Sequence, residues 1–278
     1  MKIGFLSDFF EHHLLGGAEL NDGVLIKHLN KRHDVVNLVS GTTTIDSVLQ
    51  VDFVIISNFV NARREVIEYI VDNKPYLLYE HDHKYVSNRD PSKFKDFKIP
   101  EEHIVNRGLY TKAKKVVCLS SSQTSIIRSN LGIDNLENIS CSLWSADRFA
   151  LLRKLNATVK NDAFAIMDSA NPIKNTALAV QMCIERGIKH ELIQSSDQVE
   201  FLTKLAGYEG LVFLPGVLES LSRLVTEAKM LGCKILTTPK KLGAAYEDWF
   251  HLSGLELIDV MENNVANALN LFEKVIGE

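Results

Sequence analysis

The sequence predicts an α/β protein of two domains, each with a parallel sheet, and three observations favour this fold class. Short apolar runs alternate with amphipathic segments in both halves of the chain, as in strands joined by crossover helices. The length of 278 residues fits two domains of ~100–200 residues each. Residues 211–238 show a strand, a Pro-Gly turn, a helix ended by Gly232 and a second strand, which is a βαβ unit.

Composition excludes several classes of protein. Hydrophobic residues make up 46% of the chain and charged residues 24%, as in ordinary globular proteins. The net charge of −4 gives no support for a nucleic-acid partner. No apolar run approaches the ~20 residues that span a bilayer, and the N-terminus resembles a first strand, not a signal peptide. The cysteines form no C-x-x-C pair, so we expect reduced thiols and a cytoplasmic protein, with peripheral membrane contact left open.

The N-terminal half begins with a strand at residues 2–7. Further strands are predicted at residues 34–38, 51–57, 75–79, 115–119 and 139–143. Helices are predicted at residues 20–32, 63–71 and 101–112, and after the N-cap residues Ser120–Ser122. The run at 51–57 is almost wholly apolar, as expected of a strand covered on both faces. Residues 88–100, which are polar and contain prolines, are expected to form a mobile surface loop.

The C-terminal half follows the same alternation. Strands are predicted at residues 163–167, 190–194, 211–214, 234–237 and 255–260. Helices are predicted at residues 176–186, 196–205, 221–231 and 263–275.

Two glycines, Gly16 and Gly17, stand between the first strand and the first helix. Glycine lets the backbone approach a phosphate or a sugar closely. The pattern is not G-x-G-x-x-G, so a nicotinamide dinucleotide site has no support. A loop that merely needs a flexible backbone is the alternative interpretation.

A polar cluster, Glu80-His81-Asp82-His83, follows the strand predicted at residues 75–79. Alternation along an extended chain puts the histidines on one side and the acids on the other, so these side chains cannot all face one metal ion. Open α/β sheets bind ligands at the carboxyl ends of their strands. A histidine there could exchange a proton with a hydroxyl group. Solvated loop residues are the alternative.

Lys174 lies just before the helix predicted at residues 176–186. A cation in this position faces the positive end of the helix dipole, which is unfavourable unless an anion lies between them. Lys174 is therefore a candidate anion-binding residue, and an exposed loop lysine is the alternative.

Two carboxylates mark the helix within residues 211–238. Glu219 is predicted at its start and Glu227 two turns further along. The backbone N–H groups of Ser220–Ser222, with Leu221 between the serines, are predicted to lie in the first turn and to offer an anion site. An anion flanked by carboxylates suggests a phosphorylated, hydroxyl-rich ligand such as a sugar nucleotide. A capped amphipathic helix with exposed acids is the alternative.

A family resemblance rests on these residues. Pro215, Glu219, Glu227, Ala228 and Leu231-Gly232 resemble the E-x7-E segment of retaining glycosyltransferases of family 4. The resemblance implies the GT-B fold, with two Rossmann-like domains whose parallel sheets face a central cleft. The acceptor-side domain would comprise residues 1–155 and the nucleotide-sugar-binding domain residues 156–278, with the terminal helix able to pack back on the first domain. Asp147 and Phe149 keep part of a further family pattern near this boundary.

The resemblance also implies a reaction. A retaining transferase would move a sugar from a nucleotide diphosphate sugar, UDP- or GDP-linked, to a hydroxyl of a glycan, a lipid-linked acceptor or a small molecule, with no metal and no other cofactor. The catalytic residues would be His81, Glu219 and Lys174, with Lys174 on the diphosphate and Glu219 on the hydroxyls of the sugar. The expected donor-binding residues are Gly16, Gly17, Ser169, Lys174, Ser220, Leu221, Ser222 and Glu227, of which Glu227 would bind the ribose. The nucleotide base would lie at the loop of residues 194–196, and the loop of residues 88–100 would lie on the acceptor side.

One departure from the family pattern concerns Ser169. Relatives usually carry an arginine five residues before the lysine, whereas this chain has Ser169 there. Either Arg223 or Lys241 replaces that cation, or activity is low or lost. The alternatives are therefore a sugar-nucleotide-binding protein with weak or no turnover, and a sugar-nucleotide epimerase of related architecture.

Overall fold

The computed structural model describes residues 1–13 and 16–278, which divide into two compact units. The first unit comprises residues 1–144 and 264–278, and the second comprises residues 145–263. The boundary that the sequence suggested, after residue 155, falls within helix α6 (Ala146–Asn156) of the second unit.

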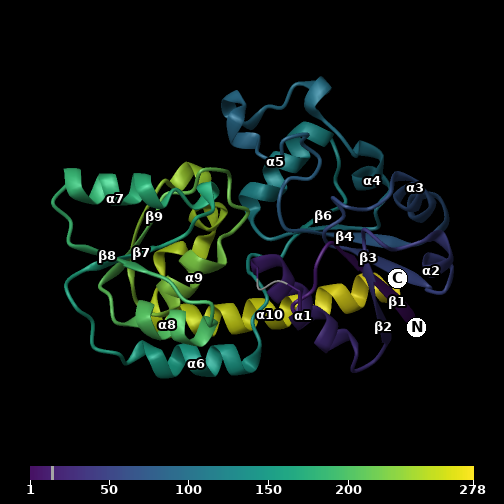
Figure 1. The fold of residues 1–278 in the computed structure, drawn as a ribbon. Helices are drawn as coiled ribbons and strands as arrows, with labels where there is room; N and C mark the ends of the chain where they lie inside the picture. Colours follow the sequence, from purple (N-terminus) through teal and green to yellow (C-terminus); the bar gives the residue numbers. More distant parts are fainter. Residues whose placement is uncertain (14–15) are drawn as a thin grey trace. The chain divides into compact units, whose positions relative to one another are not determined.

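A parallel sheet with the strand order β2-β1-β3-β4-β5-β6 forms the centre of the first unit (Figure 1). Its strands are β1 (Lys2–Ser7), β2 (Asp34–Val39), β3 (Phe53–Ile56), β4 (Tyr76–Glu80), β5 (Val116–Cys118) and β6 (Leu136–Asn138). The strand predicted at residues 139–143 is wrong. Strand β6 ends at Asn138, and Ser140 adopts a left-handed conformation (φ 54°), which interrupts an extended chain.

The helices of this unit are α1 (Gly17–Leu29), α2 (Ile45–Leu49), α3 (Arg64–Asn73), α4 (Arg107–Lys112) and α5 (Ser121–Leu131). The Ser120 hydroxyl caps α5 as predicted, since it accepts a hydrogen bond from the N–H of Gln123 at 3.2 Å. The helix predicted at residues 101–112 is only partly right. Glu101–His103 form a 3₁₀ turn, and Asn106 is left-handed (φ 58°) immediately before α4.

Strand order decides which face of the sheet each helix covers. Right-handed crossovers place α1 on one face and α2–α5 on the other. On the α2–α5 side, Val66 and Ile70 of α3 pack with Leu78 and Val116 of the strands in one apolar cluster. All residues of β3 are buried, as the unbroken apolar run predicts. The strands stay parallel, but β1 connects to β2 on one side of the sheet and the chain continues from β3 to β6 on the other, so the carboxyl ends of β1 and β3 form a topological switch point.

The second unit contains a parallel sheet with the order β10-β9-β7-β8. Its strands are β7 (Phe164–Met167), β8 (His190–Ile193), β9 (Gly210–Phe213) and β10 (Lys234–Thr237). Its helices, besides α6, are α7 (Thr176–Glu185), α8 (Gln198–Ala206) and α9 (Arg223–Met230). Helix α7 covers one face, where Ala179 and Cys183 pack on Ile166 and Val212, and α8 lies on the other (Figure 1).

Helix α10 (Gly254–Gly277) ends the chain and replaces the strand predicted at residues 255–260. Its residues Leu257, Ile258 and Met261 are buried at helical spacing, and the pattern continues through Val265 and Phe272. A short apolar run does not distinguish a strand from the first turns of an amphipathic helix, which is why the prediction failed.

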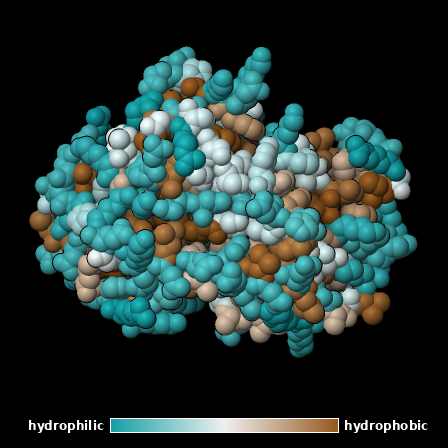
Figure 2. All heavy atoms as spheres, turned by 180° about the vertical axis from the view of Figure 1, so that it is seen from behind, coloured by the Kyte–Doolittle hydropathy of each residue, from teal (hydrophilic) through white to brown (hydrophobic). Residues whose placement is uncertain are grey.

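The surface is mainly polar. Figure 2 shows hydrophilic side chains over most of one face, with apolar side chains exposed in patches between them. Within the part of the chain that the structure describes, every helix is too short or too polar to cross a membrane.

Candidate functional site

Lys174 lies in a loop that its own hydrogen bonds hold in place. Asn171 opens the short 3₁₀ turn Pro172–Lys174, its Oδ1 accepting from the N–H of Ile173 at 3.0 Å. The hydroxyl of Thr176 donates to the carbonyl of Met167 at 2.9 Å and thereby ties the start of α7 to the end of β7. Lys174 is thus presented at the carboxyl end of the sheet in the second unit, where ligands of such sheets bind.

Lys174 forms an ion pair with Glu219. Its Nζ donates to Oε1 of Glu219 at 2.9 Å, and the two side chains are only 28% and 18% exposed. The same Nζ lies 5.3 Å from the centre of the Phe213 ring. The sequence predicted both residues as ligand-binding groups, and the structure places them in direct contact.

Backbone hydrogen bonds join the loop around Glu219 to two other loops. The N–H of Glu219 donates to the carbonyl of Lys241 at 3.0 Å, and its carbonyl accepts from Gly243 at 2.8 Å. The side chain of Lys241 returns to the carbonyl of Gly216 at 3.0 Å. Gly216 in turn donates to the carbonyl of Ile173 at 2.8 Å, next to Lys174. A closed ring of contacts therefore brings Lys174, Glu219 and Lys241 together.

Helix α9 begins later than predicted. Its first residue is Arg223, and Ser222 is the N-cap residue with the unusual φ of 76°. The first four N–H groups of a helix have no partner inside it. Those groups belong here to residues 222–225, so only Ser222 of the predicted trio contributes one. Ser220 and Leu221 lie in the preceding loop, and their donor-binding role remains a prediction.

Glu227 lies one turn into α9 and is buried. Its Oε1 is 3.7 Å from Nε of Arg223, and both side chains are almost fully enclosed. Arg223 is therefore engaged with Glu227 on the same helix, whereas Lys241 belongs to the ring of contacts around Lys174.

Ser169 shapes the loop before Lys174. Its N–H donates to the Thr176 hydroxyl at 3.3 Å, and its Oγ accepts from the N–H of Asn171 at 3.2 Å. Ser169 also lines a groove of about 670 Å³ along α7. In the predicted base-binding loop, the Ser195 hydroxyl donates to Glu200 at 2.7 Å.

A second polar cluster occupies the switch point of the first unit. Asp22 of α1 is fully buried, and its Oδ2 accepts hydrogen bonds from the hydroxyls of Ser7 (3.1 Å) and Ser57 (2.7 Å). Its Oδ1 lies 2.9 Å from Nε2 of His81. Nδ1 of His81 has no hydrogen-bond partner among the described residues. Asp22 thus orients the imidazole of His81, whose unpaired Nδ1 is itself buried.

Gly16 lies against Glu19, near this cluster in the sequence. A Cβ at position 16 would be 2.3 Å from a carboxylate oxygen of Glu19, so only glycine leaves room for that carboxylate here. Burial raises the pKa of Glu19, and the nearby charge of Asp22 raises it further, although hydrogen bonding to the backbone opposes both. Gly17 is the first residue of α1.

Sequence reasoning did not identify Asp22. A weak signal existed, because the buried residues of α1 include the polar Glu19, Asn21 and Asp22 beside Leu25 and Leu29. Polar residues on the buried face of an otherwise amphipathic helix are uncommon, and they mark groups that need partners.

The other residues of the Glu80–His83 cluster are buried or held by contacts within the protein. Glu80 is buried, accepts from Lys84 at 3.0 Å and also from the Tyr110 hydroxyl. Burial acts to lower the pKa of Lys84, but the carboxylates of Asp82 and Glu80 outweigh it, so this pKa lies above its usual value. Among the residues that the structure describes, no group of three or more His, Cys, Asp or Glu could hold a metal ion.

His83 leads to a prediction about stability and pH. Its side chain is fully buried, and neither ring nitrogen has a hydrogen-bond partner among the described residues. Burial lowers its pKa from 6.5 to about 4, against the opposing charge of Asp82. An unfolded chain therefore binds this proton at a higher pH than the folded chain does, so the free energy of unfolding falls as pH drops from 6.5 to 4.

Titration of His83 should lower the free energy of unfolding by ~1.4 kcal/mol per pH unit, or about 3 kcal/mol between pH 6.5 and pH 4. We expect His83→Phe to lack this loss. Urea unfolding of both proteins between pH 7 and pH 4 would measure the difference, with the exposed His251→Phe as a control. If the free energies of unfolding of the unaltered protein and His83→Phe differ by the same amount at every pH, His83 does not titrate in this way.

Comparison with known proteins identifies the fold. No protein-family model matches the chain, and no curated protein matches its sequence. The structure is similar to that of Anabaena Alr3699/HepE in complex with UDP, with a TM-score of 0.58 and 13% identity over 96% of this chain and 91% of that one.

Two further solved structures are similar. The catalytic domain of starch synthase IV from Arabidopsis thaliana, bound to ADP and acarbose, has a TM-score of 0.60 and 10% identity, with 99% of this chain and 98% of that one covered. AviGT4, a glycosyltransferase involved in avilamycin A biosynthesis, has a TM-score of 0.56 and 13% identity, with 99% and 96% covered. At this level of identity the similarity shows the fold alone. The chain has the GT-B fold, with two Rossmann-like domains.

Proposed function

We propose that this protein is a retaining glycosyltransferase that moves a sugar from a nucleotide diphosphate sugar, UDP- or GDP-linked, to a hydroxyl acceptor. The observation that carries the proposal is the ion pair between Lys174 and Glu219. Glu219 lies in the loop that leads into the N-terminus of α9. It supplies a cation for a diphosphate and a carboxylate for sugar hydroxyls in one place. GT-B neighbours that contain UDP and ADP support the proposal.

The chemistry requires that negative charge on the departing diphosphate be neutralised. In our proposal the diphosphate replaces Glu219 as the partner of Lys174 and accepts from the N–H groups at the start of α9. Glu219 is then free to accept hydrogen bonds from hydroxyls of the donor sugar. Glu227 binds the ribose. These protein groups act without a metal ion or another cofactor.

The acceptor belongs to the first unit in this proposal. His81, oriented by Asp22, contacts the reacting sugar, and the loop at Gly16 and Gly17 shapes the acceptor site. The acceptor is a hydroxyl of a glycan, a lipid-linked molecule or a small molecule. The buried, free cysteines are compatible with a reducing cytoplasmic setting, which forms part of the proposal.

A thermal-shift screen tests the donor site. We expect UDP or GDP, or one of their sugar conjugates, to raise the melting temperature, because a ligand that binds only the folded state stabilises it. Lys174→Met should abolish most of the shift. Lys189→Met is the matched control, since Lys189 also forms an ion pair in this unit, with Asp162. A folded protein that no nucleotide stabilises would contradict the proposal.

The second phosphate-binding cation gives a separate prediction. Ser169 supplies no charge, and Lys241 is the cation that the ring of contacts holds near Lys174. We expect Lys241→Met to weaken binding of a nucleoside diphosphate about 10–100-fold, as for a lost charge-assisted hydrogen bond. Its exposed neighbour provides the control, Lys240→Met, which should change binding less than about twofold. Calorimetric titration measures both, and equal losses would exclude a specific role for Lys241.

A binding protein without turnover is the second candidate, and the neutral turn at Ser169 favours it. Hydrolysis or transfer from the donor that stabilises the protein distinguishes the two. Turnover that disappears in Glu219→Ala supports the transferase, whereas binding without turnover supports the second candidate. Interconversion of free sugar nucleotides in the absence of an acceptor would indicate an epimerase.

A further inference from the structure

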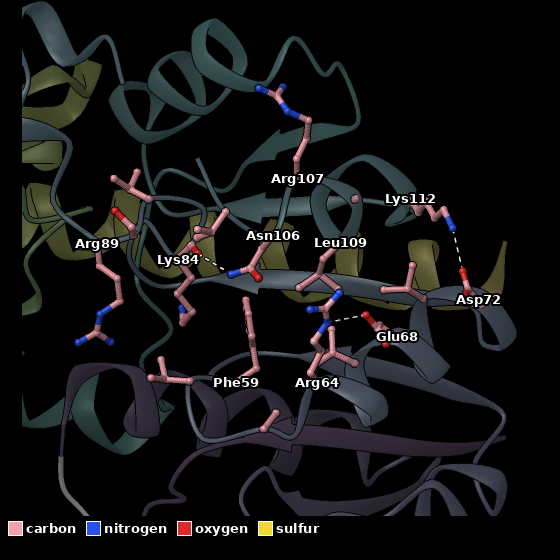
Figure 3. Close-up of a pocket in the computed structure, with 18 residues that line it drawn as sticks. Phe59, Arg64, Glu68, Asp72, Lys84, Arg89, Asn106, Arg107, Leu109 and Lys112 are labelled. Carbon is pink, nitrogen blue, oxygen red and sulfur yellow. Dashed lines mark hydrogen bonds and ion pairs between the residues drawn. The ribbon is translucent and has the colours of Figure 1, made fainter. Parts of the chain in front are cut away.

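A cavity of about 790 Å³ lies between α3 and α4 in the first unit (Figure 3). Its size is within the range of sites for small organic ligands, about 300–1,000 Å³. Neither the ion pair at Lys174 nor the Asp22–His81 pair lines it. The residues assigned to the proposed reaction therefore lie outside this cavity.

One wall of the cavity is the partly exposed face of α3. Arg64, Ile67, Glu68 and Val71 line it at helical spacing, whereas Val66 and Ile70 of the same helix point into the core. Phe59 and Leu109 are buried and form its apolar floor. The apolar part of the cavity can thus hold a hydrocarbon chain or a ring.

Charge is distributed unevenly around the cavity. At the α3 end the charges are balanced, because Arg64 pairs with Glu68 at 2.7 Å and Lys112 with Asp72 at 2.8 Å. These acids are the carboxylates among the lining residues that the structure describes. At the other end, Lys84 is buried between Glu80 (3.0 Å) and Asp82 (2.8 Å), so the exposed cation there is Arg89 (Figure 3), whose partner Asp82 does not line the cavity.

Arg89 is only loosely held. Its guanidinium lies 3.5 Å from Asp82 and is 52% exposed, and its backbone is left-handed (φ 56°). A non-glycine residue in this conformation is strained, and such residues often lie at ligand sites. Arg107, in contrast, is bound through both oxygens of Glu101 and points away from the cavity (Figure 3).

We infer that this cavity binds a small amphiphilic anion, with its phosphate or carboxylate head at Arg89 and its apolar body over Phe59, Ile67 and Leu109. The planar guanidinium of Arg89 matches either anionic head, and the apolar floor selects against inorganic ions. The ligand requires both features, so neither a free phosphate ion nor a neutral amphiphile of the same length should bind well.

Octyl phosphate below its micellar concentration is the probe for a calorimetric titration. It should bind the unaltered full chain at least about 10-fold more tightly than inorganic phosphate or octyl glucoside, because each buried methylene contributes to affinity. Binding of all three probes with equal strength, or of none, would overturn the inference.

Gly108 allows the cavity to be filled. It lines the cavity, and a Cβ there would meet no atom within 4 Å. Gly108→Phe should therefore occupy the space and abolish octyl phosphate binding, without the strain of a positive φ and with better helix propensity. The matched control is Gly277→Phe, at a helical glycine with equally open surroundings. Unchanged binding in Gly108→Phe would place the ligand elsewhere.

Arg89 tests the anionic head. Arg89→Met should weaken octyl phosphate binding about 10-fold while leaving octyl glucoside unchanged. The control is Arg128→Met, because Arg128 is similarly exposed (49%) and equally loosely paired, 3.6 Å from Asp134. If both variants weaken binding equally, the effect comes from the overall surface charge, and Arg89 does not bind the anionic head. Nucleotide-induced thermal shifts should remain in every variant, since they depend on Lys174.

Discussion

Glu219→Gln will bind a nucleoside diphosphate at least as tightly as the unaltered protein and will transfer sugar about 10-fold more slowly. The two effects separate because Glu219 has two roles in the proposed reaction. In the free protein it occupies Lys174 at 2.9 Å, so it competes with phosphate for that cation. Removing its charge frees Lys174. With a sugar bound, the same change replaces a charge-assisted hydrogen bond, worth about 1.5–3 kcal/mol, by a weaker one.

Calorimetry with UDP or GDP and a turnover assay with the matching donor sugar measure the two properties. Glu209→Gln is the control, because Glu209 also pairs with a lysine, Lys234, in the second unit. It should leave both properties unchanged. If Glu219→Gln loses diphosphate binding, Glu219 does not compete with phosphate for Lys174. If it transfers sugar at the normal rate, Glu219 does not contact the donor sugar.

Much of the second unit follows from sequence because its signals are local. Apolar runs and helical spacing predicted the strands and helices around Lys174 and Glu219, and ligands of such sheets gather at the strand ends. The start of α9, at Arg223, was predicted two residues too early. The turn before it depends on hydrogen bonds from Glu219 to Lys241 and Gly243, more than twenty residues away, which no local pattern reveals.

The first unit shows the other limit of sequence reasoning. His81 was predicted from its place after β4, but Asp22 was not, although the two side chains touch. They are separated by 59 positions in the chain and meet only because β1, β3 and β4 are neighbours in the sheet. The function of a polar residue such as Asp22 is decided by its partners, and those are set by the fold.

Asp22→Asn should lower transfer about 10²–10⁴-fold, the range that positioned acid–base groups contribute. The buried carboxylate accepts from Ser7 and Ser57 as well as from His81. An amide in its place presents one oxygen, so His81 loses its orientation. The change should also lower the free energy of unfolding by about 1–3 kcal/mol, because buried donors lose their partner.

Stability loss alone could reduce the measured rate, so the two effects must be separated. Ser57→Ala removes one donor to Asp22 without touching His81, and it should cost about 1 kcal/mol in stability while changing transfer only a few-fold. Urea unfolding and the turnover assay measure both quantities in each variant. A similar loss of transfer in both variants would make Asp22 a purely structural residue.

The decisive comparison is a double-mutant cycle with His81→Gln. If Asp22 acts by orienting His81, the double variant should transfer sugar no more slowly than the worse single variant, because the second change removes a group that no longer functions. Independent roles would instead multiply the two losses. Since the imidazole and the carboxylate share one hydrogen bond of 2.9 Å, we expect the losses not to multiply. Multiplied losses would mean that His81 acts without Asp22.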